Sequence, residues 1–169
     1  MRVLVLLLGA GLLLTASACG SEAKQEVVAP HGRIGPFRIG VTTGHQLVAQ
    51  LGEPARRMRL VYGNGPGFDL IYRCGQACQT SYSVGLDGRI HDFLTTSGAF
   101  VTPRGSYVGM STAAAEQHEG KRLRGECPGR VLYLGHGLSL VALAGKVSYI
   151  ILLGPKSLFS HACSTPRGS

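Results

Sequence analysis

The residues best suited to chemistry in this 169-residue chain are its five cysteines, at positions 19, 74, 78, 127 and 163. A thiol can be acylated, oxidised to a disulfide or bound to a metal ion, and its spacing and compartment decide which occurs. The Cys-x-x-Cys spacing of redox catalysts is absent from the chain. Disulfides are therefore favoured if the protein is exported, and a four-thiolate zinc site is the alternative.

Other side chains that could perform catalysis are scattered along the chain. The six histidines show no His-x-x-x-His pair or other metal-ligand spacing. The Gly-x-Ser-x-Gly elbow of a serine hydrolase is missing, and the glycines at 63, 65 and 67 lack the spacing of a dinucleotide-binding loop. The Asp and Glu residues show no obvious carboxylate pair. These observations favour a protein that is not an enzyme, with no catalytic residue, cofactor or metal ion.

The first 18 residues have the layout of a secretory signal peptide. Arg2 is their only charge, an apolar run extends from Val3 to Leu14, and small residues precede Cys19. An apolar run of about 12 residues is too short to span a bilayer, which needs about 20. We therefore expect residues 1–18 to be removed during export.

The small residues directly before Cys19, and the polar stretch from Gly20 to Gln25, resemble the lipobox of bacterial lipoproteins. In that family the cysteine is acylated through sulfur and becomes the first residue of the mature protein. The resemblance implies a protein anchored through Cys19 to the extracytoplasmic face of a bacterial cell membrane. Ala16-Ser17-Ala18 also fits ordinary signal peptidase, which would leave Cys19 without lipid.

Without Cys19, an even number of cysteines remains, and four cysteines allow three pairings. Cys74 and Cys78 lie in the connection between two expected strands, so we favour a local disulfide there. Cys127 would then hold the C-terminal tail through Cys163.

The formal net charge of the chain is +8, from 17 basic and 9 acidic residues. Such a balance can indicate nucleic-acid binding. Here the basic residues are scattered, and an exported protein rarely meets nucleic acid. We expect a solvated positive surface close to anionic lipid headgroups, and no nucleic-acid partner.

After a lipidated tether at 19–31, the chain repeats itself in two halves, at 32–98 and 99–169, the second ending in a C-terminal tail. Each half contains a short pattern typical of the start of a helix, with hydroxyl residues that can cap it. Thr43 and Gln46 form a capping box before the first helix, and the second helix is predicted over Thr112 to Glu119.

Alternating apolar and polar residues follow each predicted helix and indicate antiparallel hairpins. One hairpin joins two strands through Gly63 to Gly67, and another turns at Asp87-Gly88 in a type I′ turn. The predicted fold class is α+β: two tandem units of one short helix plus an antiparallel β-meander, with the helices on one face of a joined sheet.

This organisation resembles outer-membrane assembly lipoproteins of the SmpA/OmlA type and the tandem-repeat β-lactamase inhibitory proteins. The resemblance is carried by Ile39-Gly40-Val41-Thr42 with Leu47, by Leu51-Gly52-Glu53-Pro54, and by Val108-Gly109-Met110-Ser111. It implies a protein-binding or envelope-assembly module that uses an exposed sheet face. A secreted enzyme inhibitor is the second interpretation, and a cell-surface small-ligand binder or hydrolase is the third.

The first predicted hairpin also provides a candidate protein-binding surface. We expect its apolar residues, among them Met58 and Phe68, to face the helices. The opposite face would then carry Arg57, Arg59, Asp69, Ile71 and Arg73. An arginine-rich mixture of this kind is typical of binding hot spots, and it is equally typical of a solvated sheet face.

Overall fold

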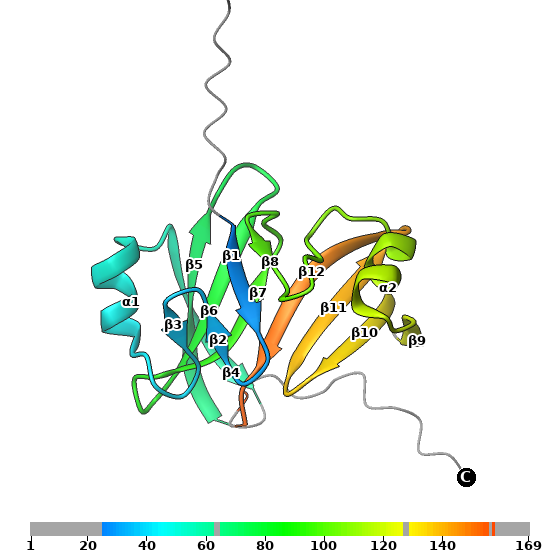
Figure 1. Cartoon of the computed structure of the whole chain (residues 1–169). Helices are drawn as coiled ribbons and strands as arrows, with labels where there is room; N and C mark the ends of the chain where they lie inside the picture. Colours follow the sequence, from blue (N-terminus) through cyan, green and yellow to red (C-terminus); the bar gives the residue numbers. More distant parts are fainter. Residues whose placement is uncertain (1–24, 63–64, 127–128, 156, 158–169) are drawn as a thin grey trace, which may run out of the picture.

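A computed structural model describes residues 25–62, 65–126, 129–155 and 157 of the chain. The fold of these residues is mostly β. The described residues form two sheets and two short helices (Figure 1). The signal peptide and Cys19 lie outside the described residues, as do Cys127 and Cys163.

The large sheet has eight antiparallel strands in the order β4-β5-β6-β7-β12-β11-β10-β9. Its first half contains β4 (Arg56–Tyr62), β5 (Gly65–Arg73), β6 (Gln79–Gly85) and β7 (Ile90–Thr95). Its second half contains β9 (Arg124–Glu126), β10 (Gly129–Gly135), β11 (Leu138–Leu143) and β12 (Lys146–Leu153). The halves meet where β7 pairs with β12, with Thr95 opposite Ile150.

The small sheet has four short strands in the order β3-β2-β1-β8, and it lies against the first half of the large sheet (Figure 1). Its strands are β1 (Glu26–Ala29), β2 (Arg33–Ile34), β3 (Phe37–Arg38) and β8 (Phe100–Val101). The predicted tether at 19–31 is therefore wrong from Glu26 onward, because β1 is part of a sheet and its Val28 is fully buried.

The two helices are α1 (Gly44–Leu51) and α2 (Thr112–Glu119), and they lie at opposite ends of the molecule (Figure 1). The predicted capping box of α1 is present: Thr43 Oγ1 accepts from Gln46 N at 3.2 Å, and Gln46 Oε1 accepts from Thr43 N at 2.9 Å. Leu47 and Ala115 reach the core from the two helices.

The predicted α+β class, with helices covering one face of a joined sheet, is wrong. The described chain is mostly strand, and the first half of the large sheet is covered by the small sheet. The strands of that sheet are two to four residues long, too short to show an alternating pattern in the sequence.

Aromatic side chains join the two sheets. The Tyr82 ring of β6 lies 6.0 Å from the Phe37 ring of β3 and 5.2 Å from the Phe93 ring of β7, measured between centroids. Phe93 in turn lies 5.1 Å from Phe100 of β8. Burial raises the pKa of the Tyr82 hydroxyl far above its ordinary range. Burial of these large rings supplies much of the apolar contact between the sheets.

The connection between β6 and β7 differs from the predicted type I′ turn. That turn needs positive φ at both central residues, whereas only Gly88, at φ +72°, has it at this site. Gly88 N donates to Gly85 O at 2.9 Å, and Gly85 N donates to Arg89 O at 3.0 Å, so the loop has one residue more. Ala144 and Gly145, with φ of +48° and +77°, form the turn between β11 and β12.

Candidate protein-binding surface

The register of β4 against β5 divides the predicted binding surface between two faces. Arg57 lies opposite Leu70, and Arg59 lies opposite Phe68. Because directly paired residues project from the same face of a sheet, both arginines share the face of Leu70. We call this the core face, since its Leu70, Tyr82 and Phe93 belong to the hydrophobic core.

Asp69, Ile71 and Arg73 project from the opposite face, which we call the second face. The prediction that all five residues share one face is therefore wrong, and the cause is the length of one loop. The expected connection ran from Gly63 to Gly67, whereas Tyr62 pairs with Gly65 in the structure. A shift of one residue in register moves every side chain of a strand to the other face.

Arg57 and Arg59 lie beside two exposed apolar side chains that were not predicted as binding residues. Phe68 is 39% exposed, and Leu86, in the loop between β6 and β7, is 76% exposed. With their neighbours they line a hollow of about 440 Å³, which we call the Phe68 hollow. Its lining consists of Arg57, Met58, Arg59, Pro66, Gly67, Phe68 and Leu86.

The charges at the Phe68 hollow are almost all positive. Arg57 Nη2 lies 2.8 Å from Glu53 Oε2 in an exposed ion pair, which contributes little to stability. The Arg59 guanidinium forms no ion pair or hydrogen bond with any residue of the described ranges. Aromatic side chains and arginines are enriched in protein-protein interfaces, and the exposed leucine adds apolar area beside them. The hollow can therefore bind an apolar group with a carboxylate beside it.

Asp69 on the second face has an internal role. It is 6% exposed, and its Oδ1 accepts a 2.6 Å hydrogen bond from Ser83 Oγ of β6. Burial raises the pKa of the Asp69 carboxyl, and the Ser83 and Ser81 hydroxyls partly oppose that rise. Ile71 is also buried, which leaves Arg73 as the exposed member of this group. These three residues do not form one accessible site.

Phe68 was expected to be buried with the other apolar residues of its strand; it does lie on the core face, but 39% of its side chain is exposed there. Leu86 had a usable signal: a large apolar residue stands directly before the Asp87-Gly88 turn, where polar residues are the norm.

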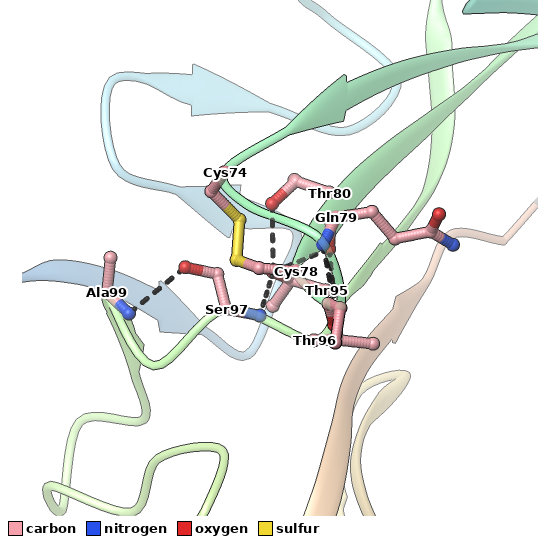
Figure 2. Close-up of a disulfide and its surroundings, with 9 residues drawn as sticks. Cys74, Cys78, Gln79, Thr80, Thr95, Thr96, Ser97 and Ala99 are labelled. Carbon is pink, nitrogen blue, oxygen red and sulfur yellow. Dashed lines mark hydrogen bonds between the residues drawn. A yellow bond between two sulfur atoms is a disulfide. The ribbon is translucent and has the colours of Figure 1, made fainter.

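The disulfide between Cys74 and Cys78 closes the connection between β5 and β6 (Figure 2). This is the local pairing expected from the sequence. Cys74 N also donates to Cys78 O at 3.0 Å, and Gln79 N donates to Thr96 Oγ1 at 2.9 Å beside the disulfide. Within the described ranges no group of three or more histidine, cysteine or acidic side chains is placed to hold a metal ion.

No helix among the described residues is long and apolar enough to cross a membrane. No family model matches the chain, and no curated protein matches it.

Two solved structures are similar. One is an extracellular protein containing a SCP domain from Bacillus anthracis str. Ames, with 14% identity and a TM-score of 0.47, over 70% of this chain and 44% of that one. The other is a DUF4309 family protein (YjgB) from Bacillus subtilis subsp. subtilis str. 168, with 15% identity and a TM-score of 0.47, over 72% of this chain and 84% of that one. This chain thus spans less than half of the first structure's length.

Proposed function

We propose that this chain is a membrane-anchored extracytoplasmic lipoprotein of a bacterium, and that it binds another protein through the Phe68 hollow. It acts as a binding or assembly module and not as an enzyme. The observation that carries the proposal is the exposure of Phe68 and Leu86 beside Arg57 and Arg59.

The exposed side chains provide a physical reason for binding. Burying a fully exposed large apolar side chain contributes about 1.5–3 kcal/mol, so Leu86, at 76% exposed, can gain most of that amount and Phe68, at 39% exposed, a smaller part. Arg59 has no ionic partner within the described residues, so a carboxylate brought beside it would gain a charge-assisted hydrogen bond. Apolar anchors next to an arginine thus provide both affinity and a preference for acidic groups.

The membrane anchor is proposed from the N-terminal sequence. The apolar run and the small residues before Cys19 support export, followed by acylation of the Cys19 sulfur. Each buried methylene contributes about 0.8 kcal/mol, so the several acyl chains of a bacterial lipoprotein would hold the chain on the membrane. Growth with a labelled fatty acid should label the wild-type protein but not Cys19→Ala. An unlabelled wild type, or equal labelling of both, would reject the anchor.

A photo-crosslinking amino acid at position 86 tests the binding surface in the producing cells. When position 86 carries the crosslinker and the rest of the chain is wild type, we expect a covalent adduct with the partner protein. Adding Phe68→Ser or Arg59→Ala should reduce the yield of this adduct at least tenfold. Tyr133→Ser is the matched control, because Tyr133 is 50% exposed on β10 in the other half of the large sheet. Equal crosslinking in all four proteins would reject the Phe68 hollow as the binding surface.

A further inference from the structure

Strand β4 is the one long edge strand in the described part of the structure. It has seven residues and pairs only with β5. The opposite edge of the large sheet is β9, with three residues, and the edges of the small sheet, β3 and β8, have two each. An unpaired edge presents backbone N–H and C=O groups that can pair with an incoming strand.

The charges on β4 select what can pair with it. The strand carries Arg56, Arg57 and Arg59 and no acidic residue. Arg57 and Arg59 project from the core face beside the Phe68 hollow, and Arg56 projects from the second face with Met58. Antiparallel pairing of this edge with the same edge of a second copy would place arginines close to arginines, which is unfavourable. The edge therefore disfavours self-association and favours an acidic strand.

From the open edge and its arginines we infer that the partner contributes an extended acidic segment, which adds to the large sheet along β4. This inference rests on the proposed function, since it describes how the partner of the Phe68 hollow is held. Arg57 and Arg59 are two residues apart on one face, so the segment should carry two acidic residues at positions i and i+2.

The spacing of side chains in a sheet supports this match. Residues directly opposite on neighbouring strands have Cβ atoms about 4.5–5.5 Å apart, close enough for a carboxylate to contact a guanidinium group. The excess of basic over acidic residues in the mature chain would also attract an acidic segment before contact.

A synthetic nine-residue peptide tests the inference with the full mature chain. Glutamate stands at alternate positions, valine and threonine fill the others, and a fluorophore at one end reports binding by anisotropy. We expect at least a tenfold weaker affinity for Arg57→Glu/Arg59→Glu than for the wild type. The matched control, Arg122→Glu/Arg124→Glu, changes the net charge equally near the opposite edge and should lose less than threefold.

Backbone pairing is tested with two N-methylated peptides. Methylation of alternate amides removes donors from one edge of the peptide only, so one methylated set should abolish binding and the other should preserve it. Replacing the glutamates by lysines should restore binding to Arg57→Glu/Arg59→Glu. Arg57→Gln/Arg59→Gln, which removes these two positive charges without adding negative ones, should show an intermediate loss and serves if the reversed variant fails to fold.

Equal binding of both methylated peptides, or equal affinities for the two charge-reversed proteins, would overturn strand addition at β4. If either of these results is obtained but the crosslink from position 86 still depends on Phe68 and Arg59, the proposed function stands and only the mode of binding is rejected. If the peptides behave as expected but the crosslink does not depend on Phe68, the Phe68 hollow is rejected instead.

Discussion

Asp69 and Ser83 form a buried hydrogen bond between β5 and β6, in which the serine hydroxyl donates to the carboxylate at 2.6 Å. The two residues lie directly opposite each other, and Asp92 of β7 is the next residue in the same row. Gly154 N donates to Asp92 Oδ1 at 3.3 Å, which links this row to the end of β12. The second face of the large sheet therefore contains buried polar side chains, and Asp69 and Ser83 bond directly to each other.

Asp69→Asn should stabilise the protein at neutral pH. Burial raises the pKa of Asp69, so the folded state keeps this proton to a higher pH than the unfolded chain does. The protonated Asp69 carboxyl therefore contributes its whole stabilisation at pH values below its ordinary pKa of 3.8, and this stabilisation is lost as the pH rises through the pKa of the folded state. The amide can still accept from Ser83 without a buried charge. We expect a gain on the order of 1 kcal/mol at pH 7, or about 2–4 °C in Tm.

Thermal unfolding at pH 3 and pH 7 checks this prediction. The gain of Asp69→Asn should shrink at pH 3, where the wild-type carboxyl is protonated in both states. Ser83→Ala is the companion variant and should lose about 1–3 kcal/mol at pH 7, because the carboxylate then lacks its donor. A lower Tm for Asp69→Asn at pH 7 would mean that the hydroxyls outweigh the cost of burial.

Thr102→Val should destabilise the segment before α2. The buried Thr102 hydroxyl donates to the buried Glu119 carboxyl, and Thr102 Oγ1 also accepts from Ser106 N at 3.0 Å. Valine removes both interactions at nearly constant volume, so we expect a loss of about 1–3 kcal/mol in the free energy of unfolding. Thr102→Ser keeps the hydroxyl and should lose less than about 1 kcal/mol. Urea denaturation measures both, and equal losses would contradict a role for the hydroxyl.

Removal of the Cys74–Cys78 disulfide should lower stability only modestly. The cysteines are four residues apart, and a loop of that length restricts the unfolded chain by about 2 kcal/mol. Cys74→Ser/Cys78→Ser should lose about that amount, measured by denaturation without reductant. Any further loss when reductant is added to this variant would report on the remaining cysteines. An unchanged free energy of unfolding would show that the disulfide restricts nothing in the unfolded state.

Local features of the fold could be predicted because their signals lie within a few residues. The Thr43 and Gln46 capping box and the Ser111 cap of α2 are examples, since each is formed between residues three apart in the chain. The small sheet could not be predicted in this way. Its β1 pairs in parallel with β8, placing Glu26 beside Phe100, and neither short strand shows a period that marks it.

The prediction of the binding surface was wrong because it also depended on a feature that local sequence patterns do not determine. Alternation identified β4 and β5, but their faces depend on the register, and the register depends on the length of one glycine-rich connection. In the observed register Met58 lies opposite Asp69, so Arg57 and Arg59 project from the same face as Phe68. Charged and apolar residues thus came together where separate faces had been expected.

Gly137→Ala should be one of the most damaging single substitutions in the turns. Gly137 has φ +81°, and a Cβ there would lie 1.9 Å from the backbone oxygen of Leu153. Leu153 N also donates to Gly137 O at 3.0 Å, so the clash would displace the end of β12. Gly145→Ala is the matched control, because Gly145 has φ +77° but open space around its Cβ position. The control should lose about 1–2 kcal/mol from the positive φ alone, and Gly137→Ala at least about 2 kcal/mol more. Equal losses in urea denaturation would show that the end of β12 moves away at little cost.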